Sequence, residues 1–149
     1  MNIENSPYIF YQVLAIVAFL VVDSSSGIIA SISIGGDTLS SAAKDQIYYT
    51  ATQPAGSAFL LLPYLTLSWI SASLARKKLF ESSKFIFFLG VMIIWTMTAL
   101  GYRSAELLMQ DGYYTAAIFE VAFLPLEFIP WLLVLLFIRY MLVRKSKET

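Results

Sequence analysis

Four long apolar runs, separated by short polar segments, dominate the pattern of this chain. A helix rises ~1.5 Å per residue, so about 20 apolar residues are needed to cross the ~30 Å hydrocarbon core of a bilayer. The second and fourth runs reach this length unaided, and the other two reach it with neighbouring residues. The pattern therefore predicts an all-helical integral membrane protein with spans at residues 7–26, 55–75, 85–104 and 115–138.

The outer end of the first span is not fixed by the pattern. The apolar run can continue from Val22 through Asp23 and the serines toward Gly27, or extend as far as Ile34. The connection that follows, residues 27–54, is long for a simple loop. Inside it, Gly35-Gly36-Asp37 interrupts the chain, and Thr38–Thr50 has apolar residues on one side. This segment is expected to pack on the bundle as a tethered helix, or else to form a recognition surface for an external ligand.

The basic residues predict how the chain lies in the membrane. Eight of the ten lie between the second and third spans or after the fourth: Arg76, Lys77, Lys78, Lys84, Arg139, Arg144, Lys145 and Lys147. Basic residues concentrate on the cytoplasmic side, so the loop 76–84 and the tail 139–149 are expected inside and the loops 27–54 and 105–114 outside. The expected fold is an antiparallel up-down bundle of four membrane helices with both termini in the cytoplasm.

Composition narrows the classes of function. Hydrophobic residues make up 58% and charged residues 13% of the 149 residues, so we expect one membrane domain over residues 1–149. There is no Cys and no His, which removes thiol nucleophiles, imidazole bases and most zinc and haem ligand sets. We expect no metal or cofactor and no enzymatic activity. The net charge of zero gives no argument for nucleic-acid binding.

The fourth span contains the strongest functional signal, because two acids lie within its apolar run. Glu120 and Glu127 are seven residues apart and so lie on nearly the same face of a helix. We expect this face to contact protein rather than lipid. Counting inward from Thr115 places Glu120 about 7 Å deep and Glu127 about 18 Å deep, near the midplane of the bilayer. An ionisable residue at that depth is a functional candidate by default.

The protonation state of Glu127 is open on energetic grounds. A charge near the midplane costs on the order of 3 kcal/mol, and protonating a glutamate at pH 7 costs about 3.7 kcal/mol. Glu127 is therefore protonated, hydrated or satisfied by another subunit. Polar residues expected at similar depth are Tyr64, Thr66 and Thr96. Near the outer end of the third span, Arg103 can reach toward Glu120 or form an ion pair with Glu106.

Three prolines predict kinks in the second and fourth spans. A proline removes a backbone donor and clashes with the carbonyl four residues earlier, so bends are expected at Pro63, Pro125 and Pro130. These bends either only shape the bundle or, together with Glu127, line a polar pocket or a gate.

The basic clusters suggest contacts at the cytoplasmic surface. Besides setting topology, they can bind anionic lipid headgroups or a cytoplasmic protein partner. The residues concerned are Arg76, Lys77, Lys78, Arg139, Arg144, Lys145 and Lys147.

Two functions from different classes fit these observations. The first is a non-enzymatic sensor or interaction subunit, a homo-oligomer of the bacterial inner membrane that signals to a cytoplasmic or membrane partner. Bacterial immunity and phage-defence systems use proteins of this size and topology, which is an analogy only. The alternative is a subunit of an oligomeric transporter or pore in which Glu127 binds a cation or proton. A membrane enzyme ranks third, because no nucleophile with a base is visible.

Overall fold

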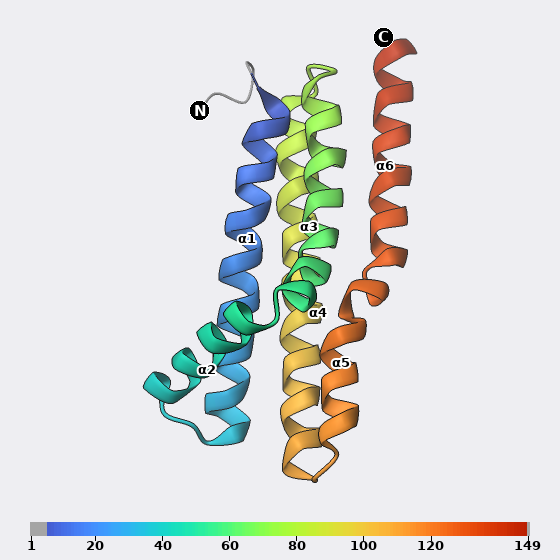
Figure 1. Cartoon of the computed structure of the whole chain (residues 1–149). Coiled ribbons are helices and arrows are strands. Elements are labelled where there is room, and N and C mark those ends of the chain that lie inside the picture. Colours follow the sequence, from blue (N-terminus) through green and yellow to red (C-terminus); the bar gives the residue numbers. More distant parts are fainter. Residues whose placement is uncertain (1–5, 149) are drawn as a thin grey trace.

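The computed structural model describes residues 6–148, apart from the side chains of Pro54, Lys147 and Glu148, and it contains helices and no strand within that range (Figure 1). Four helical segments are long and apolar enough to cross a membrane: Pro7–Gly35, Ala55–Ala75, Phe80–Gln110 and Tyr114–Ser146. This confirms the predicted helical fold with four apolar segments of membrane-spanning length.

The first helix extends well beyond the predicted residue 26. Helix α1 (Pro7–Ala30) begins with Pro7, whose fixed φ suits the first turn, and continues into one π-helical turn, η1 (Ser31–Gly35). It ends at Gly36, which has a φ of 78° and donates its N–H to the Ser31 carbonyl. A left-handed residue at this position is a common helix stop that glycine adopts without strain.

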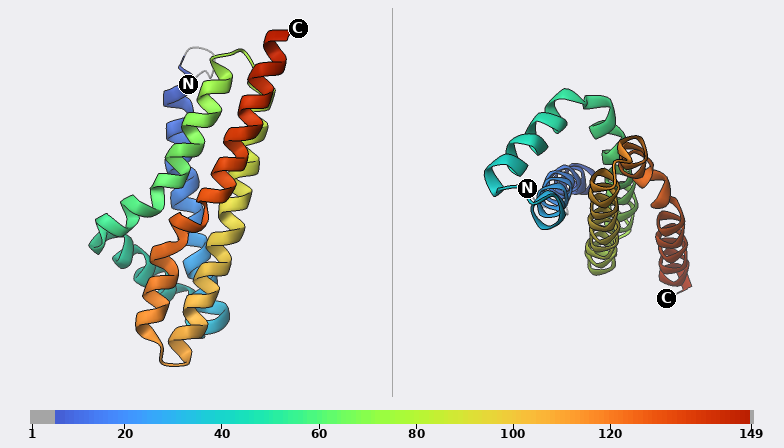
Figure 2. Two further views of the ribbon diagram at one scale, coloured as in Figure 1. Left: turned by 90° about the vertical axis from the view of Figure 1, so that its right-hand side faces the viewer. Right: turned by 90° about the horizontal axis from the view of Figure 1, so that it is seen from below.

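Helix α2 (Leu39–Thr52) occupies most of the remaining first connection. Thr38 caps its N-terminus by accepting a hydrogen bond from the Ser41 N–H at 3.3 Å. This helix lies across the outer half of α1 at a steep angle to the bundle (Figures 1 and 2). It buries only Ala42 and Gln46, so a short apolar side and one amide hold it against the spans.

Helices α3 (Pro54–Ala75) and α4 (Phe80–Gln110) pack against α1 to form the core. Pro63 lies inside α3, which continues through it as one helix. α4 is longer than the predicted span 85–104 at both ends. Gly90 lets α3 approach α4, because a Cβ at this position would overlap the Leu67 side chain. The largest fully buried side chains include Tyr11, Leu67, Ile70, Leu74 and Ile86.

The fourth apolar run forms two helices rather than one. Helix α5 (Tyr114–Glu127) and helix α6 (Ile129–Glu148) meet at Phe128, whose side chain is buried. Pro125 lacks a backbone donor near the end of α5, and the Pro130 ring would clash with the carbonyl of residue 126 in a continuous helix. After this break α6 packs mainly on α3 (Figure 2).

The start of α1 and the end of α6 lie at the same end of the bundle as the α3–α4 connection (Figure 1). The α1–α2 and α4–α5 connections lie at the other end. The two predicted basic segments therefore share one end of the molecule. Their assignment to the cytoplasm remains a prediction.

Candidate functional site

A buried acid connects three helices near the end of the bundle that holds the α1–α2 and α4–α5 connections, which we call the outer end after its predicted orientation. Asp23 of α1 is only 5% exposed. Its Oδ2 accepts a hydrogen bond from Gln46 Nε2 of α2 at 3.1 Å, and its Oδ1 accepts one from the Tyr102 hydroxyl of α4 at 2.7 Å. We call these three side chains the outer polar triad. Through Gln46 the triad joins α2 to α1, and a second hydrogen bond, from the Ser57 hydroxyl of α3 to the Thr50 carbonyl at 3.4 Å, joins α2 to α3.

The local sequence explains why α2 can approach α1 so closely. Gly27 follows Asp23 by one helical turn, and a Cβ at Gly27 would overlap the Gln46 side chain. Any larger residue there would push Gln46 away from Asp23. Counting from Pro7 at ~1.5 Å per residue places Asp23 about 24 Å along α1, in the half nearer the α1–α2 connection. A carboxylate buried among helices needs the hydrogen bonds it receives.

A pocket of about 470 Å³ lies beside the triad, between α2 and the outer halves of α1, α4 and α5. This volume is in the range of small-molecule sites. Gln46 and Tyr102 belong both to the triad and to the pocket wall. The rest of the wall combines acids, tyrosines and apolar residues, among them Asp45, Tyr48, Tyr49, Glu106, Met109, Ile118 and Val121.

The electrostatics of this region are negative. None of the residues that line the pocket is Lys or Arg. Ser31 donates a hydrogen bond to Asp37 Oδ2 at 2.9 Å and also lies against Glu106. Burial, together with the nearby Asp23 charge, raises the pKa of the Tyr49 phenol above its ordinary value, so Tyr49 stays protonated at neutral pH.

The two acids predicted as the centre of the site lie elsewhere. Glu120 is half-buried, and Glu127 is exposed at the last residue of α5. Within the chain Glu127 therefore contacts no protein core, and its contact with another subunit stays a prediction. The Glu127 side chain is on the surface because, at the break between α5 and α6, the Phe128 side chain is the one that packs into the core.

The predicted polar neighbours of Glu127 do not gather around it. Thr66 and Thr96 donate their hydroxyls to carbonyls of their own helices, Leu62 at 3.0 Å and Met92 at 2.9 Å. Tyr64 is buried with its ring 5.8 Å from the Phe19 ring and its hydroxyl toward Thr98. Of the predicted set, Tyr64 alone is fully buried.

The predicted ion pair between Arg103 and Glu106 is not formed in the described part of the chain, and Arg103 does not pair with Glu120 there either. Arg103 is exposed, whereas Glu106 lies against Ser31 on the pocket side of α4. Residues three apart on a helix are neighbours, but the Arg103 and Glu106 side chains point in different directions.

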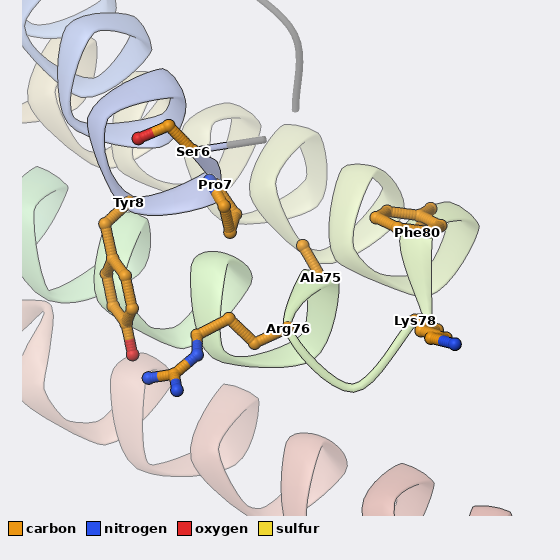
Figure 3. A pocket seen from close by; sticks show the side chains of 7 residues that line it. All are labelled: Ser6, Pro7, Tyr8, Ala75, Arg76, Lys78 and Phe80. Carbon is orange, nitrogen blue, oxygen red and sulfur yellow. The ribbon is translucent and has the colours of Figure 1, made fainter. Parts of the chain in front are cut away.

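The basic residues divide into two groups. Arg76, Lys77, Lys78, Arg144 and Lys145 are exposed, and the Lys147 side chain is outside the described residues. Arg76 lies over the Tyr8 ring at 5.6 Å beside a pocket of about 660 Å³, while Lys78 points away on the far side of it (Figure 3). Arg139 instead donates to Ser73 Oγ at 2.5 Å and lies over the Trp69 ring. Arg139 therefore fastens α6 to α3.

Sequence reasoning missed the outer polar triad, although one sign of it was present. Asp23 is an acid inside an extended apolar run, which is the criterion that selected Glu127. It lies three residues before the end of the predicted span 7–26, and it was not singled out because the pattern did not fix where that span ends. Gln46 and Tyr102 carry no such sign, since both are ordinary residues of a surface helix and a span. Comparison with protein-family models, with curated proteins and with solved structures finds no match for this chain.

Proposed function

We propose that this chain is a non-enzymatic sensor subunit of the bacterial inner membrane, which detects a ligand at its outer pocket and acts through a membrane or cytoplasmic partner. The observation that carries the proposal is the outer polar triad. It couples the surface helix α2 to two spans at the wall of a ligand-sized pocket. A ligand that enters the pocket touches two of the three triad side chains.

A route from the pocket to the inner end runs through α1 and α4. At the inner end of the bundle the Ser83 hydroxyl lies 2.5 Å from the Tyr11 hydroxyl and 2.8 Å from the Ser71 carbonyl, so α1, α3 and α4 are joined there as well. These contacts lie close to the exposed basic connection that contains Arg76, Lys77 and Lys78. A shift of α1 against α4 therefore changes the surface offered to a partner.

The test compares what co-purifies with triad and surface variants in mild detergent, with its stoichiometry. Asp23→Leu is expected to change recovery of the partner, and joint replacement of Arg76, Lys77 and Lys78 by Gln is expected to reduce it. Asp111→Leu is the matched control, because Asp111 is exposed and outside the pocket. Unchanged recovery in both Asp23→Leu and the basic variant would contradict the proposal.

A second candidate is an oligomeric transporter or pore subunit. The observation that favours it is the exposure of Glu127 at the α5–α6 break. A glutamate facing lipid costs on the order of 3 kcal/mol, so a homo-oligomer that covers this face would relieve the cost. In proteoliposomes, Glu127→Gln should abolish cation or proton flux while Glu81→Gln leaves it intact. Equal flux in the two variants would remove this candidate.

A further inference from the structure

We infer that the outer pocket binds an organic cation, with its ammonium group at Glu106 and its apolar body against α4 and α5. The inference rests on the proposed sensor function, because it names the class of ligand that the sensor would detect. Three properties of the pocket support it: the direction of its hydrogen bonds, its charge and the composition of its walls.

The hydrogen bonds of the triad leave the pocket rich in acceptors. Gln46 gives an amide hydrogen to Asp23, and Tyr102 gives its only hydroxyl hydrogen to Asp23. Both side chains also line the pocket, where the Gln46 carbonyl oxygen is an acceptor and the second hydrogen of Gln46 Nε2 is directed at the Tyr102 oxygen. Ser31, a third lining residue, gives its hydrogen to Asp37. On the side of Ser31 and the Gln46 carbonyl the wall therefore presents acceptors, and a ligand group placed there must be a donor.

The charge of the wall selects a positive donor. Asp45 and Glu106 line the pocket, and no Lys or Arg does. Asp37 lies near Ser31 and repels the Glu106 carboxylate. Asp23 is a further acid close to the pocket, where it accepts hydrogen bonds from the lining residues Gln46 and Tyr102. An ammonium group placed at Glu106 relieves this repulsion and forms charge-assisted hydrogen bonds, which are stronger than neutral ones.

The remaining walls distinguish an organic cation from a metal ion. Ala105, Met109, Ala117, Ile118 and Val121 give one side of the pocket an apolar surface with no hard oxygen ligands. Within residues 6–148 no group of three or more acidic side chains could hold a metal ion. Tyr48 and Tyr49 from α2 add aromatic rings, which favour organic cations. A volume of about 470 Å³ accommodates an amine with a ring or a short alkyl chain.

The test uses three probes with one phenyl ring and different head groups: 2-phenylethylammonium, 2-phenylethanol and 3-phenylpropanoate. Each is titrated calorimetrically at pH 7 into the full chain in detergent micelles, and titrations into empty micelles give the partition background. The ammonium is expected to bind saturably, the alcohol at least about tenfold more weakly, and the carboxylate not at all.

Variants locate the binding. Glu106→Gln keeps the shape of the side chain and should weaken ammonium binding by about tenfold. Asp111→Asn, an acid on the same outer end but outside the pocket, should leave it unchanged. The inference is overturned if the carboxylate binds as tightly as the ammonium, if no probe binds saturably, or if the double variant Asp45→Asn and Glu106→Gln binds the ammonium like the parent chain.

A second readout separates this inference from the proposed function. Spin labels at Lys44→Cys on α2 and Lys77→Cys at the inner end report the position of α2 while ligand is added. If the ammonium binds as described but neither this distance nor partner recovery changes, the site stands and the sensor function fails. If Asp23→Leu alters partner recovery while the ammonium does not bind, the sensor function stands and the ligand class fails.

Discussion

At the scale of single residues, a few polar contacts fix how apolar helices meet. Apolar side chains pack against lipid almost as well as against each other, so hydrogen bonds and close backbone approach select the partner helix. Asp23 does this at the outer end of the bundle and Ser83 at the inner end. Removal of such a group leaves its partners buried without a hydrogen bond, which costs more than the bond itself contributes.

Asp23→Ala should therefore lower the free energy of unfolding by about 1–3 kcal/mol, because it strands the Tyr102 hydroxyl and the Gln46 amide. Thermal unfolding in detergent, followed by far-ultraviolet circular dichroism, measures the loss. Asp111→Ala removes an exposed carboxylate and should stay within about 0.5 kcal/mol of the parent chain. Equal stability of the two variants would show that the triad does not hold the bundle.

Gly90 offers a second residue-scale prediction. Gly90→Ala places a methyl group against the buried Leu67 side chain and should destabilise the bundle by about 1–3 kcal/mol. Gly56→Ala is the matched control in α3, because its nearest neighbour, the Tyr49 hydroxyl, is 3.8 Å from the new Cβ. The same unfolding measurement compares them. If the Gly56 variant is as unstable as the Gly90 variant, the loss of stability comes from a general effect of replacing a helix glycine and not from the contact with Leu67.

At the scale of elements, the sequence predicted the helices better than it predicted their contacts. Long apolar runs fix the four membrane-length segments because few other structures satisfy their backbone in lipid. Gly35-Gly36 marks the end of η1, and Pro125 with Pro130 marks the α5–α6 break. Helix faces were harder to predict: the hydrophobic patterning of membrane helices is weak, since both lipid and core accept apolar residues. For that reason the pattern did not indicate that Glu127 is exposed within the chain.

The attachment of α6 gives an element-scale prediction. Arg139→Leu removes both the hydrogen bond to Ser73 and the contact with the Trp69 ring. We expect faster hydrogen exchange over residues 129–143, because α6 then has fewer contacts with α3. Arg103→Leu changes an exposed arginine to the same residue and should leave that exchange unchanged. Mass spectrometry of peptides from α6 makes the comparison.

At the scale of the whole molecule, charge is distributed unevenly between the two ends. Basic residues cluster at the end that holds the start of α1, the end of α6 and the α3–α4 connection, whereas Asp45 and Glu106 line the outer pocket. Sequence alone predicts this asymmetry in charge, because successive connections between spans must lie at alternate ends of the bundle. It does not predict the pocket, which needs α2 to fold back over α1 and so depends on contacts between residues far apart in the chain.

Sidedness is testable with single cysteines, since the chain contains none. Lys77→Cys should react with a membrane-impermeant maleimide only after the membrane is opened, and Lys44→Cys should react in spheroplasts with an intact inner membrane. Both positions are exposed, so lack of reaction reports the membrane barrier and not burial. The reverse labelling pattern would invert the predicted topology and place the pocket on the cytoplasmic side.

The separation of 79 residues between Asp23 and Tyr102 has a consequence for biosynthesis. If the chain inserts from its N-terminus, α1 enters the bilayer with its acid before the ribosome has made the hydroxyl that will pair with it. Gln46, 23 residues after Asp23, is made first and donates a hydrogen bond to one carboxylate oxygen. The other oxygen has no partner from this triad until α4 brings Tyr102. Assembly intermediates that end before Tyr102 should therefore be the species that membrane chaperones and proteases recognise.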